Sequence, residues 1–211
     1  MSRKMTRLRL ENFLKQYASD RYTLDIGSGD KYYREFFPNS KYIDIDPARS
    51  PDVVADAHAL PFPDKTFEQI VCTEVLEHLH TPEKALNEMW RVLKPGGRLI
   101  LTTRFIFPIH DAPGDYFRFT EYGLRHLLRG WKIQDFRAEA GTFDTLAILF
   151  QRLLFQTRFR MNKAVKAVLL ASGWLIRLFG RIPHTEFGDI RHRSKVANIM
   201  ASGYYVMAIK E

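Results

Sequence analysis

Short apolar runs alternate with helical stretches along most of the 211 residues. Apolar runs bounded by Gly, Pro or Asp predict strands, and apolar side chains that recur every three or four positions predict helices. The predicted strands cover 22–26, 41–45, 52–55, 67–72, 98–103, 131–137 and 203–210, and the predicted helices cover 5–18, 30–37, 82–93 and 120–128. Strands that alternate with helices indicate an α/β fold whose sheet is mostly parallel.

The stretch 142–181 interrupts this alternation, because it is helical in character, apolar and basic. Basic side chains share one sector of a helical wheel drawn over 161–181, namely Lys163, Lys166, Arg177 and Arg181. The opposite side carries Val165, Val168, Leu169, Leu175, Ile176 and Phe179, with Trp174 near the boundary. We expect one domain over 1–211, with an N-terminal helix within 1–20 and a basic helical insertion over 142–200 before the last strand.

The net charge of +8 is unevenly distributed along the chain. Residues 1–144 hold 21 Lys or Arg and 21 Asp or Glu, whereas residues 145–211 hold 11 and 3. A neutral body with a basic appendage favours an acidic partner, such as a membrane surface, an anionic substrate or nucleic acid, although a solvated basic face explains the charge equally well. Nucleic acid is disfavoured, because the aromatic side chains do not interleave with the basic ones as a stacking platform requires.

Three roles are open for the insertion: a cap over a substrate pocket, a membrane-interface element formed by 161–181, or a dimer contact. A basic polar face with Trp174 at its edge, opposite Leu, Ile and Phe, has the composition of an interfacial helix. We favour the cap, touching a lipid-linked or hydrophobic acceptor at a membrane surface.

The single cysteine, Cys72, excludes an internal disulfide and a zinc cluster built on cysteines. The basic start MSRKMTRLRLENF lacks the apolar run of a signal peptide, and no stretch has the roughly 18 apolar residues of a spanning helix. These features predict a cytoplasmic protein, with peripheral attachment to a membrane surface as an option.

The end of the first predicted strand contains an acid and is followed by two spaced glycines, in the segment Leu24-Asp25-Ile26-Gly27-Ser28-Gly29. Glycines allow a tight turn and a close approach of the backbone to a ligand. A dinucleotide motif needs a third glycine at position 32, where this chain has Tyr32, so NAD and FAD are disfavoured. A plain tight turn accounts for two spaced glycines about as well as a ligand does.

Acids also follow the next two predicted strands. Asp44 ends the second strand, where a carboxylate can accept both hydroxyls of a ribose, and Asp56-Ala57 can pair with an exocyclic amine and a ring nitrogen. Three acids at three successive strand ends suit a ligand with an ammonium group, a diol and an adenine but no phosphate. Turn chemistry before Pro47 is the alternative explanation for Asp44 and Asp46, and it should account for at least one of them.

The chain resembles the class I S-adenosylmethionine-dependent methyltransferases, specifically the methyltransferase type 11 group. The matching segments lie in the family's order between residues 22 and 138. They are LDIGSG (24–29), YIDIDPA (42–48), ADAHALPFPDKTFEQIVCTEVLEHL (55–79) and PEKALNEMWRVLKPGGRLILTT (82–103), and this last segment is the most specific.

The resemblance implies a Rossmann-like, doubly wound sheet of seven strands with an antiparallel last strand, and S-adenosylmethionine as the cofactor. In the implied site, Asp25, Gly27 and Gly29 line the methionine end, Asp44 binds the ribose, Asp56 and Ala57 bind the adenine, and Thr73 lies beside the transferable methyl. Two departures affect this assignment: Lys31 replaces the family's third glycine, and the segment 47–53 is too short for the usual helix after the second strand.

The pattern Glu74-Val75-Leu76-Glu77-His78 follows the fourth strand. In a helical turn, Glu74, Glu77 and His78 share one face and can hold Mg²⁺ or a similar ion, with His110 as a fourth ligand. The pattern resembles the metal-ligand motif of ubiquinone-pathway O-methyltransferases and of small-RNA 3′-end 2′-O-methyltransferases. Alternatives are a metal-free Glu and His bound to neighbouring loops, which we favour, and His78 as a base or substrate contact.

The loop 105–120 follows the fifth strand and should lie over the substrate mouth. Tyr116 and Arg118 suit a flat or anionic acceptor, and His110 with Asp111 can form a general-base pair. An ordinary lid with buried aromatic side chains is equally consistent with the pattern.

These observations predict a methyltransferase that transfers a methyl group to a small-molecule, lipid-linked or glycan acceptor at oxygen. The alternatives are a non-catalytic methyltransferase-like binding module and an RNA 2′-O-methyltransferase.

Overall fold

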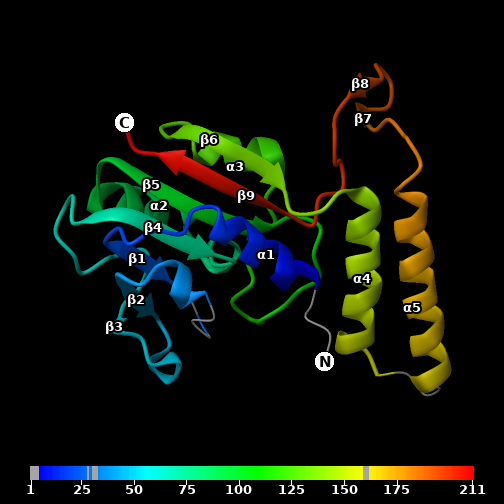
Figure 1. Ribbon diagram of the computed structural model, residues 1–211, viewed down its shortest axis with the longest axis horizontal. Coiled ribbons are helices and arrows are strands. Elements are labelled where there is room, and N and C mark those ends of the chain that lie inside the picture. Colours follow the sequence, from blue (N-terminus) through cyan, green and yellow to red (C-terminus); the bar gives the residue numbers. More distant parts are fainter. Residues whose placement is uncertain (1–4, 28, 30–32, 159–161) are drawn as a thin grey trace.

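The computed structural model describes residues 5–27, 29, 33–158 and 162–211 of the chain. Its main sheet has seven strands in the order β3-β2-β1-β4-β5-β9-β6 (Figure 1). Only β9 runs antiparallel to its neighbours in this sheet. The strands are β1 (Thr23–Ile26), β2 (Ser40–Asp44), β3 (Val53–Val54), β4 (Phe67–Thr73), β5 (Leu93–Arg104), β6 (Lys132–Ala138) and β9 (Gly203–Ile209). The predicted fold class is confirmed.

Helices cover both faces of the sheet, and one pair of helices stands beside it (Figure 1). The α-helices are α1 (Met5–Lys15), α2 (Pro82–Val92), α3 (Glu121–Leu127), α4 (Thr142–Gln156) and α5 (Asn162–Phe179). Three single 3₁₀ turns follow strands: η1 (Arg34–Phe36), η2 (Pro47–Arg49) and η3 (Leu76–His78). A small hairpin of β7 (Phe187–Asp189) and β8 (Ser194–Lys195) precedes β9.

Two apolar clusters, one on each face, hold these layers together. The larger cluster packs α2 and α3 against the sheet through residues such as Leu86, Met89 and Leu124. The smaller one packs α1 through Phe13 and Leu14. All four residues of β1 are buried, as expected for a central parallel strand covered on both faces.

Three predicted elements differ from the observed ones. The helix expected over 30–37 is described only as the turn η1, because 30–32 lie outside the described residues. The strand expected over 98–103 begins earlier, so Lys94-Pro95-Gly96-Gly97 ends α2 but is already part of β5. The short segment after β2 holds only η2, which confirms that the usual helix is missing there.

The insertion between β6 and β9 consists of α4, α5 and the β7–β8 hairpin, and the hairpin was not predicted. α4 lies between the sheet and α5, so α5 is the outermost helix (Figure 1). Asp144 of α4 connects three helices, because its carboxylate pairs with Arg9 of α1 and, at 2.9 Å, with Arg177 of α5. No helix among the described residues is long and apolar enough to cross a bilayer.

Gly203 provides a test of how closely β5, β9 and β6 pack. A Cβ at Gly203 would lie 2.3 Å from the carbonyl oxygen of Thr103, and both are backbone positions that cannot move independently. We expect Gly203→Ala to lower the free energy of unfolding by about 1–3 kcal/mol in urea denaturation. Gly130→Ala is the matched control, since a Cβ at Gly130 meets no atom within 4 Å and should leave stability unchanged or raise it by up to about 1 kcal/mol. Equal losses in the two variants would contradict this account.

Candidate functional site

The carboxyl ends of the parallel strands meet at one edge of the sheet, and the predicted site residues follow those ends. β1 pairs with both β2 and β4, so the segments after these three strands are neighbours. β3 extends the same edge, because Ala55 N donates to the Asp44 carbonyl oxygen at 3.0 Å. In open α/β sheets, ligands bind in the crevice at this edge.

The glycine turn after β1 requires its first glycine for two separate reasons. Gly27 has a φ of +66°, and a Cβ there would lie 2.5 Å from Cγ2 of Val75 in the loop after β4. Gly29 also has a left-handed backbone, with a φ of +56°. The turn therefore depends on glycine geometry and packs against the loop after β4. Lys31 and Tyr32 lie outside the described residues.

Asp25 and Thr73 are brought together by a tyrosine that sequence reasoning missed. The buried Tyr33 hydroxyl donates to Asp25 Oδ1 at 3.2 Å and lies 2.9 Å from Thr73 Oγ1. Tyr33 comes just before η1, within the segment predicted as a helix after the glycine turn. The hydroxyl therefore ties the end of β1 to the end of β4 beneath the glycine turn.

Asp44 and Asp46 have different surroundings, although both follow β2. Asp46 caps η2, since its Oδ1 accepts from Ala48 N at 2.9 Å. Asp44 Oδ1 accepts from Asp46 N at 2.9 Å. The turn chemistry expected for one of the pair thus applies most directly to Asp46.

Asp56 lies beside the buried Ala57 and is oriented by His58. His58 Nε2 accepts from Thr81 N at 3.3 Å, so Nδ1 carries the proton and donates to Asp56 Oδ1 at 2.6 Å. Burial raises the pKa of Asp56, but the hydrogen bonds from His58 outweigh it and hold this pKa below its usual value. Asp56 is therefore a fixed carboxylate at the end of β3.

A buried ion network lies under the other half of this edge, and sequence reasoning missed it as well. Arg104 at the end of β5 pairs with Glu74 and donates to Glu139 Oε2 at 2.6 Å. Glu139 also accepts from Ser202 Oγ at 2.6 Å and from the Tyr205 hydroxyl at 3.0 Å. Burial alone would lower the pKa of Arg104, but the two carboxylates raise it above its usual value. The available signal was an unusual Arg directly after the apolar strand LILTT.

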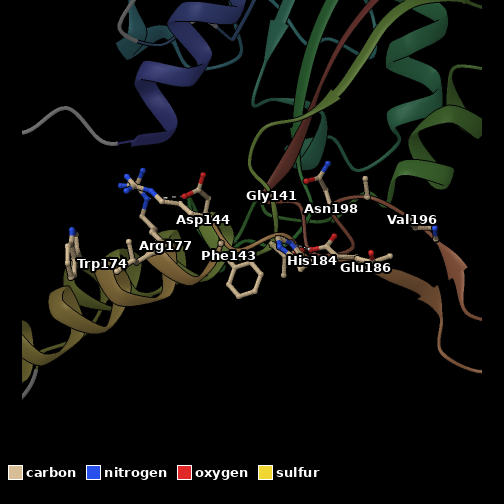
Figure 2. A pocket seen from close by; sticks show the side chains of 16 residues that line it. Gly141, Phe143, Asp144, Trp174, Arg177, His184, Glu186, Val196 and Asn198 are labelled. Carbon is tan, nitrogen blue, oxygen red and sulfur yellow. Dashed lines mark hydrogen bonds and ion pairs between the residues drawn. The ribbon is translucent and has the colours of Figure 1, made fainter.

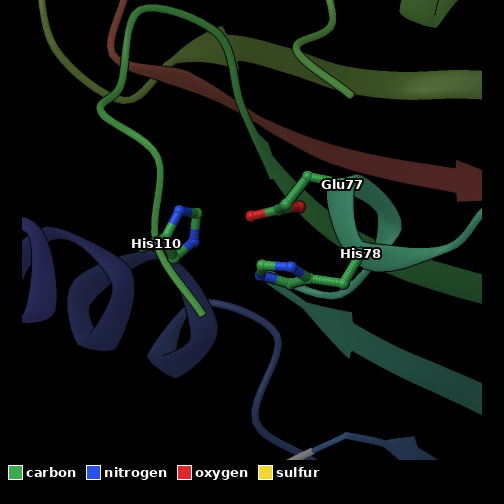
Figure 3. Close-up of side chains that lie close together, drawn as sticks. All are labelled: Glu77, His78 and His110. Carbon is green, nitrogen blue, oxygen red and sulfur yellow. The ribbon is translucent and has the colours of Figure 1, made fainter. Parts of the chain in front are cut away.

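Glu77, His78 and His110 lie close together, each offering a ligand atom within 4.8 Å of the others (Figure 3). Thr103 Oγ1 donates to Glu77 Oε2 at 2.7 Å, and within the described part of the chain Glu77 Oε1 has no hydrogen-bond partner. Burial raises the pKa of Glu77, although the charge of Arg104 opposes this shift. Burial and the neighbouring His78 lower the pKa of His110.

The tautomer of His78 follows from its hydrogen bond. Its Nδ1 lies 2.7 Å from the Gly114 carbonyl oxygen, which can only accept, so Nδ1 carries the proton. In neutral His78 the lone pair is then on Nε2. That atom can take a proton from an acceptor or bind a metal ion.

Two predictions about the histidine cluster need correction. Glu74 precedes η3, with a φ of +57°, and its carboxylate pairs with Arg104, so it does not share a helical face with Glu77 and His78. The carboxylate beside His110 is Asp115, whose Oδ2 accepts from His110 N at 3.0 Å, rather than the exposed Asp111. Hydrogen bonds from Arg118 lower the pKa of Asp115 to about 2.

The loop 105–120 folds back onto η3, because the backbone N–H groups of Tyr116 and Phe117 both donate to the Glu77 carbonyl oxygen at 3.0 Å. Arg118 uses all five of its N–H groups within this loop, on Asp115 and on three carbonyl oxygens. All five donors are thus engaged within the loop, and the substrate role predicted for Arg118 stays a prediction. The exposed Tyr116 stays a candidate, since its ring lies 6.3 Å from that of His80.

Helix α4 lies against the same loop. Ile148 forms a small buried cluster with Phe107 and Ala140, and Gln156 Nε2 donates to the Ile109 carbonyl oxygen at 2.9 Å. The half-buried Arg152 guanidinium lies 4.3 Å from the centre of the Phe107 ring. α4 thus forms a wall beside the histidine cluster.

The chain resembles known proteins in both sequence and fold. Residues 24–101 match the family model described as a methyltransferase domain. The ubiquinone/menaquinone biosynthesis C-methyltransferase UbiE of Pasteurella multocida is 43% identical over 72 residues, which are 34% of this chain and 26% of that protein. The corresponding protein of Haemophilus ducreyi is 39% identical over 83 residues. The chain spans less than a third of the length of these curated relatives.

Solved structures share the fold over nearly the whole chain. The [4+2]-cyclase SpnF has a TM-score of 0.61 at 18% identity, covering 96% of this chain and 80% of that one. Geranyl diphosphate C-methyltransferase from Streptomyces coelicolor A3(2), solved with Mg²⁺, geranyl diphosphate and S-adenosyl-L-homocysteine, has a TM-score of 0.60 at 11% identity and covers 96% and 77%. Residues 24–101 therefore resemble the methyltransferase domain of that family model, and the chain has the fold of these solved structures.

Proposed function

We propose that this chain is a methyltransferase that uses S-adenosylmethionine and acts on a small acceptor with an ionisable hydroxyl. The observation that carries the proposal is a row of carboxylates on three neighbouring strands: Asp25 within β1, Asp44 at the end of β2 and Asp56 just after β3. Such a row suits a cofactor that offers an ammonium group, a diol and an adenine.

The cofactor's parts follow from the order of the strands. The methionine end would lie over the Gly27 turn beside Asp25, with the ribose at Asp44 and the adenine at Asp56 and Ala57. Thr73 would then face the sulfonium end, because the Tyr33 hydroxyl connects it to Asp25. Gly29 would complete the turn around the methionine end.

The acceptor would bind beside His78 and the loop 105–120. Methyl transfer from a sulfonium is an in-line displacement, so positioning the acceptor is most of the task. A base that removes the acceptor's hydroxyl proton activates either the oxygen or a ring carbon conjugated to it. His78 Nε2 carries a lone pair and is our candidate for that base, with Tyr116 at the mouth of the site.

The relatives support a small-molecule acceptor rather than RNA. UbiE is named for C-methylation in quinone biosynthesis, and the Streptomyces enzyme is a C-methyltransferase of geranyl diphosphate. Phe107 and Ile148 form a buried apolar contact that holds α4 against the loop 105–120. Whether the methyl goes to oxygen, as the sequence predicts, or to carbon depends on the acceptor.

A metal ion is the second candidate for activating the hydroxyl. Glu77 Oε1 and His110 Nδ1 are buried and have no hydrogen-bond partner among the described residues. The Nδ1–H of His78 donates a hydrogen bond to the Gly114 carbonyl oxygen, as metal-binding histidines commonly do with their second nitrogen. Two imidazoles and one carboxylate suit a transition metal such as Zn²⁺ or Fe²⁺ better than Mg²⁺, which prefers oxygen ligands. When bound, such an ion would act as a Lewis acid on the acceptor oxygen.

Calorimetry with S-adenosylmethionine tests the cofactor site. We expect Asp44→Ala to weaken binding about tenfold or more, because it removes a charge-assisted hydrogen bond worth roughly 1.5–3 kcal/mol. Gly27→Val should abolish binding, because its side chain would clash with Val75 and strain the turn. Asp46→Ala is the matched control and should bind as the wild type does. Wild-type protein that fails to bind the cofactor would leave a non-catalytic binding module as the better description.

His78 can be tested separately from the cofactor site. We expect His78→Ala to lower kcat roughly 10²–10⁴-fold while leaving the affinity for S-adenosylmethionine unchanged, measured with labelled cofactor and a panel of phenolic and quinol acceptors. His80→Ala is the control, because His80 is exposed and stacks on His58 instead. Chelation and elemental analysis distinguish a histidine base from a metal ion. Methyl transfer that continues in protein shown to be metal-free supports His78 as the base. Activity that is lost on chelation and restored by Zn²⁺ or Fe²⁺ supports the metal ion. Full activity of His78→Ala would rule out both roles for this residue.

A further inference from the structure

Helix α5 carries a second apolar face that the fold does not cover. Its inner face packs on α4: a Cβ at Gly173 would lie 3.6 Å from Cβ of Phe150, and one at Gly180 would lie 2.8 Å from Cβ of Phe143. On the opposite side, large apolar side chains recur at helical spacing and stand in solvent. This outer face consists of Val168, Trp174, Leu175, Leu178, Phe179 and, just beyond the helix, Ile182.

The exposure of these side chains is high for residues of this kind. Trp174 is 67% exposed and Val168 is 64% exposed. A single exposed apolar residue is ordinary, but a contiguous apolar stripe on the outermost helix indicates an interaction surface. In Figure 1, α5 has α4 on one side and no other element on the side facing away from the sheet.

Basic side chains border this outer face, and acidic ones are missing from the whole segment. Residues 145–185 contain seven Lys or Arg and no Asp or Glu. Lys163, Arg177 and Arg181 are exposed on α5 and the turn that follows it. An apolar face with a basic border is the pattern of a helix that lies in a membrane interface.

A cavity of about 730 Å³ opens at the C-terminal end of this face (Figure 2). Trp174, Leu178 and Arg181 of the α5 segment line one side, and Lys195 of the hairpin lines the other. The acidic residues of the cavity are already bound. Asp144 pairs with Arg9 and Arg177, and Glu186 accepts from Ile199 N at 3.0 Å.

The cavity's remaining charge is therefore positive. Neither Arg181 nor Lys195 forms an ion pair with any residue that the structure describes. Two cations beside an apolar rim suit the phosphate of an anionic lipid headgroup, with its acyl chains along the outer face.

We propose that the outer face of α5 docks on an anionic phospholipid bilayer, with Arg181 and Lys195 at the lipid phosphate. A second copy of this chain is a poorer occupant, because two such faces would bring their basic borders together and repel. The bilayer interior can cover the apolar side chains of this face, and the anionic headgroups can pair with its basic border. The proposal goes beyond methyl transfer and does not depend on it.

Vesicle binding tests the proposal with the full chain, without cofactor or acceptor. We expect sedimentation with phosphatidylcholine vesicles only when they contain phosphatidylglycerol, and weaker binding at high salt. Trp90 and Trp131 pack against each other, so the exposed Trp174 should dominate a blue shift of fluorescence and be quenched by lipids brominated on their acyl chains.

Two pairs of substitutions separate the apolar and the basic contributions. Arg181→Gln with Lys195→Gln should lower the partition coefficient roughly thirtyfold, at about 1 kcal/mol per basic residue near an anionic surface. Leu175→Ser with Ile182→Ser should abolish the quenching of Trp174. The matched controls are Arg129→Gln and Tyr122→Ser, which change an exposed cation and an exposed apolar residue elsewhere. Thermal unfolding confirms that each variant is folded.

Three results would overturn the proposal. The wild-type protein could fail to bind anionic vesicles, or the control substitutions could weaken binding as much as the test pairs do. The third is a dimer that forms without lipid in sedimentation and buries Trp174. Because the assay contains no S-adenosylmethionine, these failures are distinct from a failure of the cofactor site, which calorimetry reports.

Discussion

The pairing of Arg104 with Glu139 and Glu74 is the interaction on which the active edge of the sheet depends. Parallel strands bring every carboxyl end to the same side, so side chains that are distant in sequence must share one crowded edge. Arg104 is buried with carboxylates on either side, and Ser202 and Tyr205 satisfy Glu139 further. Removing one member of such a buried set leaves an uncompensated charge, which commonly costs about 3–5 kcal/mol. The network thus fixes the ends of β5 and β6 and the start of β9.

This arrangement divides the edge into two halves with different chemistry. The half at the ends of β1, β2 and β3 carries three carboxylates, and hydrogen bonds from His58 hold the pKa of Asp56 below its usual value. The half after β4 and β5 uses Arg104 to neutralise its own acids, and it keeps Glu77 buried beside two histidines, where burial raises the pKa of Glu77. A cationic cofactor suits the first half. A neutral acceptor, deprotonated only when it reaches His78, suits the second.

Local patterns predicted the parts of this site that depend on local geometry. Residues that are adjacent in the sequence are enough to identify the glycine turn, the acids at the ends of β2 and β3, and the order of strands and helices. Arg104 and Glu139 were missed because their meeting depends on β9 being inserted between β5 and β6, which no local pattern shows. Glu74 was misplaced because the spacing of three and four residues assumed an α-helical turn, whereas the chain turns at Glu74 with a positive φ before η3.

The helical wheel of 161–181 illustrates the same limit. It grouped Val165, Leu169 and Ile176 with Val168 and Leu175 as a single apolar side. In the folded chain that side is wider than α4 can cover, so the first three pack inward while the last two remain exposed. Which part of an apolar arc becomes core depends on the width of the neighbouring element, and the wheel holds no information on that width.

The position of α4 connects the two functions proposed for the chain. One side of α4 contacts the loop beside His110 through Ile148 and Gln156, and the other side holds α5. A bilayer against the outer face of α5 would therefore lie one helix away from the acceptor mouth. An apolar acceptor dissolved in that bilayer would have a short path to His78, whereas a polar acceptor would gain nothing from the docking. The architecture thus favours acceptors that partition into membranes.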